Sequence, residues 1–258
     1  MLLCIDIGNT HTHFGVVSNG QALFQRELPT RSIDHPAAGF GPILDRLVAE
    51  HPALEGVALC SVVPVATKLL ERVFELHQPA LRLFQLTPEK RLGVPLSYPQ
   101  PLEIGQDRLA NVAGAQAYCG TPAIVIDLGT AVTFDIITRS QGYEGGIIAP
   151  GFDVMRRYLH EQTALLPLLD DSIEVPRIIG QSTVEAMRIG AVIGMGGMIQ
   201  ALLAAVLAEL ARRGESLPRV LATGGTAALL EKTVRPPVTV VPDLTLRGLA
   251  AAWRLNPT

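Results

Sequence analysis

The chain has 258 residues, of which 48% are hydrophobic and 17% charged, which excludes an intrinsically disordered protein and leaves ample length for a buried core. Its net charge of −3, without any run rich in Lys or Arg, gives no electrostatic reason to expect nucleic acid binding.

Three predicted strands open the chain, and helices alternating with strands follow them. Short apolar runs predict the strands, and apolar residues at helical spacing, as in residues 37–50, predict the helices. A proline-rich loop precedes the last helix of this half. The expected strands are residues 2–6, 12–17, 21–28, 56–60 and 81–86, and the expected helices are residues 37–50, 64–76 and 107–119.

The second half restarts the same succession of elements. The expected strands are residues 123–127, 131–138, 143–148, 219–222 and 238–241; the expected helices are residues 151–162, 182–213 and 244–254, with one more helix between the last two strands. The repetition indicates an internal duplication of one α/β unit. We therefore predict two lobes, residues 1–117 and 118–258, with a ligand cleft between them.

One apolar segment, Ala191 to Ala208, approaches the length of a membrane span. Arg188 and Glu209 bracket it closely, glycines interrupt it, and the sequence offers neither a second span nor an aromatic belt. A helix that is apolar on all sides also occurs in the core of a soluble protein or at an oligomer interface. We therefore expect a buried helix at a subunit contact, a homodimer, and no membrane partner.

The cysteines and the N-terminus favour the cytoplasm. Cys4, Cys60 and Cys119 form no CxxC pair, and the first two lie in apolar strand patterns, as is typical of buried, reduced thiols. The first residues are predicted directly as a strand, without the basic segment and cleavage site of a signal peptide.

Both halves contain a strand–turn–strand segment in which an Asp leads into a Gly, namely CIDIGNTHTHFGVV from Cys4 and VIDLGTAVTFDII from Val125. One copy would most simply be a hairpin turn, because Asp, Gly, Asn and Thr all favour turns. Two copies, each after an apolar strand, favour a ligand site. Glycine lets a ligand approach the main chain, N–H groups and hydroxyls bind anions, and a nearby carboxylate can hold a metal ion that accompanies phosphates.

The paired turns resemble the phosphate loops of the superfamily of acetate and sugar kinases, heat-shock ATPases and actin, and the whole chain resembles a type III pantothenate kinase. The resemblance implies an α/β fold of two similar ribonuclease-H-like lobes, each a β-β-β-α-β-α-β unit, with ATP in the cleft between them. The matching stretches run nearly end to end in the family's order: DIGNTHTHFG (6–15), SVVP (61–64), Tyr98 with GQDRLAN (105–111), DLGTAVTFD (127–135), GGIIAPG (145–151), TALLP (163–167), GQSTVEAM (180–187), ATGG (222–225) and PDLTLRGL (242–249).

The implied reaction transfers the γ-phosphoryl group of ATP to the primary hydroxyl of pantothenate, giving 4′-phosphopantothenate in the first step of coenzyme A biosynthesis. It needs positioning, cations that offset developing charge, and a base for the hydroxyl proton. The resemblance places Asp107 as that base and Arg108 on the pantothenate carboxylate. Without the resemblance, both would most simply be an N-cap and a solvated neighbour at a helix start. The residues expected to bind pantothenate are Tyr98, Gly105, Gln106, Asp107, Arg108 and Thr183.

The resemblance also implies the nucleotide and cation sites. Asp6 is expected to support the Mg²⁺ that accompanies ATP, in part through water, because Mg²⁺ keeps several of its waters. Asp127 matches the ligand of a monovalent cation, K⁺ or ammonium, although the residues alone leave a second Mg²⁺ site open. The residues that match phosphate-binding positions are Asp6, Ile7, Gly8, Asn9, Thr10, His11, Thr12, His13 and Thr130.

Two other functions are weighed against the kinase. A non-catalytic ATP-binding regulator on the same scaffold, of the accessory transcription factor type, would not need both a base and a carboxylate-binding Arg. A sugar or acetate kinase of the same superfamily is disfavoured by Tyr98, Arg108 and Thr183. The chain departs from the family at Glu103 and Ile104, where smaller or more polar residues are expected, so the loop on the substrate side is expected to be shaped differently.

Overall fold

The computed structural model describes residues 1–35, 38–170, 172–230 and 234–257. By its contacts the chain divides into two compact units: unit 1 comprises Met1–Gly120 with Asp243–Thr258, and unit 2 comprises Thr121–Pro242. The C-terminal helix α7 (Leu244–Leu255), expected in the second lobe, belongs to unit 1 because it packs closely against α3 (Gln106–Cys119). The hydroxyl of Thr245 donates to Oδ1 of Asn111 over 2.8 Å and fixes that pairing.

Unit 1 is built on one mixed sheet in the order β3-β2-β1-β5-β6, with β4 beside β2. Strand β1 is antiparallel to β2 and parallel to β5. The strands are β1 (Leu2–Ile7), β2 (His11–Ser18), β3 (Gln21–Ala22), β4 (Arg26–Pro29), β5 (Val57–Ser61) and β6 (Leu83–Gln85); the helices besides α3 and α7 are α1 (Phe40–Glu50), α2 (Pro64–His77) and the 3₁₀ turns η1 (Thr30–Ser32) and η2 (Pro101–Glu103).

The two faces of this sheet have different coverings. Leu3, Ile5 and Ile7 of β1 share one hydrophobic cluster with the apolar residues of α1 and α2. Since side chains alternate along a strand, Cys4 and Asp6 point to the opposite face, which α3 and α7 cover through their contacts with β1 and β5. The alternation therefore places Asp6 on the same side of the sheet as the helix that carries Asp107.

Unit 2 has a sheet in the order β11-β10-β7-β8-β9, with β7 antiparallel to β8 and parallel to β10. Three antiparallel strands followed by two parallel ones is also the arrangement in unit 1, so the two predicted repeats and the α/β fold class are confirmed. The elements are β7 (Ala123–Leu128), β8 (Ala131–Thr138), β9 (Gly142–Pro150), α4 (Phe152–Glu161), α5 (Thr183–Arg212), β10 (Arg219–Thr223), η3 (Ala227–Leu229) and β11 (Thr239–Val240).

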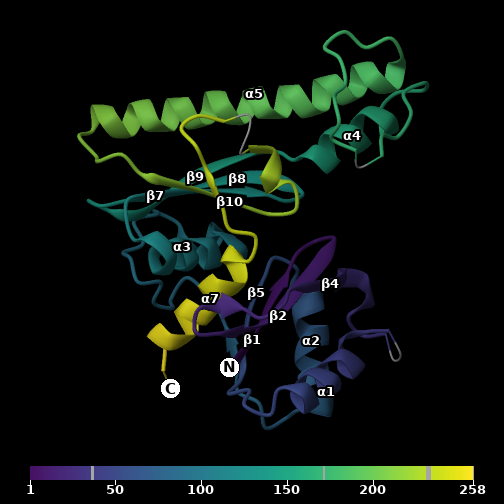
Figure 1. The fold of residues 1–258 in the computed structure, drawn as a ribbon. Helices are drawn as coiled ribbons and strands as arrows, with labels where there is room; N and C mark the ends of the chain where they lie inside the picture. The colour runs from purple at the N-terminus through teal and green to yellow at the C-terminus, as the bar shows by residue number, and fades with distance from the viewer. Residues whose placement is uncertain (36–37, 171, 231–233, 258) are drawn as a thin grey trace. The chain divides into compact units, whose positions relative to one another are not determined.

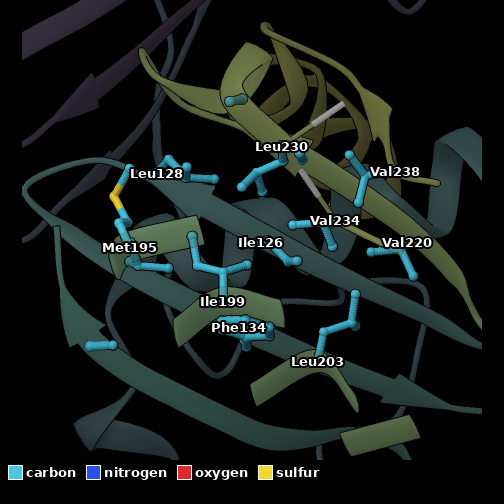
Figure 2. Packing of buried hydrophobic residues seen from close by; sticks show 14 of the residues in the cluster. Ile126, Leu128, Phe134, Met195, Ile199, Leu203, Val220, Leu230, Val234 and Val238 are labelled. Carbon is cyan, nitrogen blue, oxygen red and sulfur yellow. The ribbon is translucent and has the colours of Figure 1, made fainter. Parts of the chain in front are cut away.

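The long helix α5 lies across one face of this sheet (Figure 1). Figure 2 shows Met195, Ile199 and Leu203 of α5 packed with Ile126 and Phe134 of the sheet, all in one buried cluster. Only 28% of the most apolar window of α5 is buried within the single chain, so the expectation that a subunit contact buries the helix stays a prediction. By length and composition alone, α5 is the one helix in the described part of the chain that could cross a membrane.

Two predicted elements differ in detail, and a third lies partly outside the described residues. The expected strand 21–28 is two short strands, β3 and β4, because the chain turns between them and Phe24 packs on the core. Helix α1 begins at Phe40 rather than at 37, and residues 36–37 lie outside the described part of the chain. Between β10 and β11 the described residues contain the 3₁₀ turn η3 followed by a helical residue at 230, and the rest of the helix expected there falls on residues 231–233, outside the described part.

Candidate active site

The first Asp-Gly turn, between β1 and β2, is held closed from within unit 1. The N–H of Gly8 donates to the carbonyl of His11 over 3.1 Å, and a Cβ atom on Gly8 would lie only 2.9 Å from that carbonyl. The hydroxyl of Thr30 donates to the carbonyl of Gly8 over 2.7 Å and lies 3.1 Å from that of Thr12. Thr12 is fully buried, so its side chain braces the turn.

The tip of this turn is exposed at Asn9, Thr10 and His11. Among the described residues, no acceptor is found for the N–H groups of Asn9 and Thr10, which lie outside the strand ladder. Exposed N–H groups beside a glycine bind anions well, because the backbone dipoles converge on the ligand. The turn therefore has the chemistry of a phosphate loop. Ile7 is fully buried, so only its backbone can take part.

Strand register places four polar residues in one row across the sheet, on the face covered by α3 and α7. Asp6 pairs with His13 on β2 and with Cys60 on β5, and His13 pairs in turn with Glu27 on β4. The thiol of Cys60 donates to Oδ1 of Asp6 over 3.3 Å, and Nδ1 of His13 lies 3.4 Å from Oε2 of Glu27. Burial lowers the pKa of His13 despite the Glu27 carboxylate, which favours the neutral imidazole beside Asp6.

Asp107 stands at the start of α3, in the first helical turn after Gly105. Its Oδ1 accepts a hydrogen bond from the N–H of Arg108 over 2.8 Å. Burial raises the pKa of Asp107, and the N–H and guanidinium of Arg108 only partly oppose this. Burial also raises the pKa of the Cys60 thiol, and the charges of Asp6 and Asp107 raise it further. The thiol therefore lies within electrostatic reach of both carboxylates.

Gln106 is turned back toward the sheet. Its Oε1 accepts from the N–H of Ser61 over 2.9 Å and from Nε2 of Gln85 over 3.2 Å. A ligand would therefore meet the amide nitrogen of Gln106. Arg108 is only 9% exposed, so a ligand would reach a small part of it. Tyr98 lies half-buried in the loop before η2.

The second Asp-Gly turn, between β7 and β8 in unit 2, repeats the first. The N–H of Gly129 donates to the carbonyl of Ala131 over 3.1 Å, the counterpart of the bond from Gly8 to His11. Gly129 and Thr130 are exposed at the tip. The N–H of Gly151 donates to the carbonyl of Thr130 over 3.2 Å, and a Cβ atom on Gly151 would overlap the carbonyls of both tip residues.

Asp127 has the place in unit 2 that Asp6 has in unit 1. It pairs in register with Thr133 on β8 and with Thr223 on β10, so oxygen-bearing side chains flank it on the same face. Gly224 closes on the turn with a φ of +92°, and a Cβ atom there would lie 2.6 Å from the carbonyl of Leu128 and 2.8 Å from Oδ1 of Asp127. Only glycine suits both that conformation and that approach.

Thr183 lies exposed at the first turn of α5 in unit 2, whereas the other residues expected to bind pantothenate lie in unit 1. Ser182 is the N-cap of α5, since its hydroxyl accepts from the N–H of Glu185 over 3.2 Å. The hydroxyl of Thr183 is therefore not needed for capping.

The donor set fits a Mg²⁺ that arrives with a nucleotide. Among the described residues no group of three or more His, Cys, Asp or Glu side chains could hold a metal ion, so a site made of protein ligands alone is not formed there. Mg²⁺ is commonly bound through one or two carboxylates, water and substrate phosphates, and a single half-exposed carboxylate such as Asp6 suits that mode. The oxygen-rich surroundings of Asp127 suit a monovalent cation.

Sequence reasoning missed two contributors to the site. Cys60 was expected only as a buried thiol, and Gln85 was not singled out. Both matter because of the parallel pairing of β5 with β1 and β6, which brings them to Asp6 and Gln106. The apolar patterns predict those strands, but which strands become neighbours is a property of the folded sheet.

Comparison with known proteins points to one family over most of the chain. The family model described as type III pantothenate kinase matches residues 2–205. A type III pantothenate kinase from Akkermansia muciniphila is 44% identical over 257 residues, covering 98% of both chains. Another from Methylacidiphilum infernorum is 39% identical over 248 residues, covering 96% of this chain and 86% of the relative.

Solved structures of lower identity share the fold. A Baf family transcriptional activator from Campylobacter jejuni matches with a TM-score of 0.61 at 18% identity, covering 98% of this chain and 97% of the other. A ROK family glucokinase from Streptomyces griseus matches with a TM-score of 0.55 at 15% identity, covering 99% of each chain. At these identities the matches concern architecture alone.

Proposed function

Since the chain belongs to the type III pantothenate kinases and therefore phosphorylates pantothenate in coenzyme A biosynthesis, we propose that Asp107 is the base of this reaction. The observation that carries the proposal is the environment of its carboxylate, which is half-buried at the start of α3 on the face of the sheet that also holds Asp6. Burial raises the pKa of Asp107, and a base with a raised pKa accepts the hydroxyl proton more readily.

The nucleotide is ATP, as the kinase family implies. The first turn, residues 6–13, is proposed to bind its phosphates through the exposed N–H groups of Asn9 and Thr10, and Thr130 is proposed to do so from the second turn. Asp6 would hold Mg²⁺, which offsets negative charge on the phosphates when it is bound. The thiol of Cys60, a weak donor, donates to Oδ1 of Asp6 and would help to orient the carboxylate.

Asp127 is proposed to hold a monovalent cation, K⁺ or ammonium. Thr133 and Thr223 flank it in register, and the close approach of Gly224 leaves the carboxylate little freedom. A positive ion there would offset charge near the phosphates bound by Thr130. The preference between the two ions is a matter for the assay below.

Pantothenate is proposed to bind through its carboxylate to Arg108, because a guanidinium can bind a carboxylate with two parallel hydrogen bonds. The partial burial of Arg108 strengthens such a contact, since water competes less for the guanidinium. Tyr98, the backbone of Gly105, the amide nitrogen of Gln106 and Thr183 are proposed as further contacts.

A homodimer is proposed from the exposed side of α5. The residues on that side are small or apolar and recur every three or four positions: Gly190, Gly194, Gly197, Ala201, Ala204 and Ala208. A Cβ atom on any of these glycines would meet no atom within 4 Å, so a second helix could approach closely. A second copy of the chain would cover this face, which argues against membrane insertion. The three free cysteines suit the reducing cytoplasm, where we place the protein.

The test is an ATP-dependent phosphorylation assay with pantothenate, sugars and acetate as acceptors, in the presence and absence of K⁺ and of ammonium. We expect turnover of pantothenate alone, stimulated by one of these ions. Turnover of a sugar or of acetate in preference to pantothenate would refute the substrate assignment. Turnover that does not depend on either ion would refute the role of Asp127.

A further inference from the structure

The first turn of α3 is tied to the sheet by one side-chain amide. Oε1 of Gln106 accepts from the backbone N–H of Ser61, at the end of β5, and from Nε2 of Gln85, at the end of β6. A carbonyl oxygen has two lone pairs, so these two donors use its full accepting capacity. Two neighbouring strands therefore hold the residue directly before Asp107.

These bonds leave the Gln106 amide only one orientation. A backbone N–H can only donate, so the atom that faces Ser61 must be the oxygen of Gln106 and not its nitrogen. Gln85 must likewise present its nitrogen to that oxygen. Among the described residues, no acceptor is found for Nε2 of Gln106.

Ser61 is itself braced from the other side. Its hydroxyl accepts from the hydroxyl of Thr67 over 2.7 Å and from the N–H of Val63 over 3.0 Å. Thr67 is only 6% exposed and belongs to α2. Helix α2, strand β5 and the start of α3 are thus connected by consecutive hydrogen bonds, and Gln85 joins this network from β6.

From this geometry we infer that Gln85 is a positioning residue for phosphoryl transfer. Together with the N–H of Ser61 it fixes the Gln106 amide, and through Gln106 it fixes the turn of α3 that carries Asp107. The inference rests on the proposed role of Asp107 as base. The base acts on the hydroxyl proton in the transition state, so its loss of alignment lowers kcat more than it raises KM.

The experiment compares Gln85→Leu, Gln106→Leu and the double variant with the wild type in steady-state kinetics, together with thermal unfolding of each protein. Gln85→Leu is expected to lower kcat between about threefold and tenfold, the effect of one lost hydrogen bond. In Gln85→Leu the KM for ATP should stay within about twofold, and the KM for pantothenate, which Gln106 is proposed to contact, should rise by a smaller factor than kcat falls. If Gln85 acts through Gln106, the double variant should have the same kcat as Gln106→Leu alone.

Gln78→Leu is the matched control. Gln78 is also in unit 1, and its Nε2 donates over the same 3.2 Å, but to Oδ1 of exposed Asp45. The kinetic constants of the Gln78→Leu protein should equal those of the wild type. A folded Gln85→Leu protein with wild-type kcat, or a double variant whose losses multiply, would overturn the inference. An Asp107→Asn protein as active as the wild type would instead overturn the assignment of the base, so the two failures are distinguishable.

Discussion

The backbone of Gly105 leaves the space that the carboxylate of Asp107 occupies. A Cβ atom built on Gly105 would overlap Oδ1 of Asp107, and no backbone atom lies in its way. Gly105 has a φ of −56°, a conformation open to any residue, so space and not backbone strain requires a glycine. The glycine before the proposed base therefore determines where the base lies.

Replacing Gly105 by Ala should lower the activity while leaving the stability of the fold nearly unchanged. The added methyl group can be accommodated by moving the Asp107 side chain, so the fold is kept while the carboxylate leaves its position. We expect kcat to fall by about tenfold to a hundredfold, as for a misplaced catalytic group. The thermal midpoint should change little. Steady-state kinetics and thermal unfolding of the same preparation measure kcat and the thermal midpoint. A variant with wild-type kcat, or one that does not fold, would contradict the proposed role of Gly105.

Asp107→Asn should lose most of its activity yet be more stable than the wild type near neutral pH. Because burial raises the pKa of Asp107 in the folded state, the native protein binds more protons than the unfolded chain and loses stability as the pH rises through the folded pKa. Asparagine cannot ionise, so the variant does not lose this part of its stability as the pH rises. The gain in unfolding free energy over the wild type should therefore increase with pH, as urea titrations between about pH 4.5 and pH 8 would measure.

Asp45→Asn serves as a control, because the pKa of Asp45 is shifted in the direction opposite to that of Asp107. A hydrogen bond from His77, at 2.8 Å, lowers the pKa of Asp45, so its stabilising effect is present above the unfolded pKa and is lost as the pH falls through the folded one. This variant should be equally or less stable than the wild type at neutral pH. If both Asn variants shift stability in the same direction, the raised pKa of Asp107 is not the cause.

The Cys60 thiol should matter for ATP more than for folding. Cys60→Ala removes the donor to Oδ1 of Asp6, whereas Cys60→Ser keeps a donor at the same place. We expect the KM for ATP to rise by about threefold to tenfold in the Ala variant and to recover in the Ser variant. Equal KM values in the two variants would mean that the bond does not orient Asp6.

A larger side chain on the exposed side of α5 should disrupt the proposed dimer. Gly194 and Gly197 have open space around them in the single chain, so Gly→Leu at either position should leave the unit folded. It should convert the dimer to a monomer, because the two helices could no longer approach closely. Light scattering measures this, with Glu75→Leu at an exposed position of α2 as the control for added apolar surface. A monomeric wild type would contradict the proposed interface.

Much of this architecture is predictable from local patterns. Apolar strands, the proline at the start of α2, the N-cap Ser182 and the repeated Asp-Gly turn all act within a few residues, so their elements were expected close to where they occur. The side of a strand also follows from alternation, once one face is known to be buried.

The rest depends on contacts between distant segments. The return of α7 to α3, and the meeting of Gln85 with Gln106, join residues whose separation in sequence carries no local pattern. The length of α5 was predicted, but its one-sided burial depends on which sheet it covers. The resemblance to a family suggested the site residues, and the structure adds the hydrogen bonds that orient them.

The central claim is that Asp107 accepts the proton during transfer of the γ-phosphoryl group to pantothenate. Its most direct test is the rate of 4′-phosphopantothenate formation by the wild type and by Asp107→Asn, measured by mass spectrometry at saturating ATP and pantothenate. The account predicts a loss of about a hundredfold to ten-thousandfold in the variant, with ATP binding retained. Equal rates in the two proteins would contradict it.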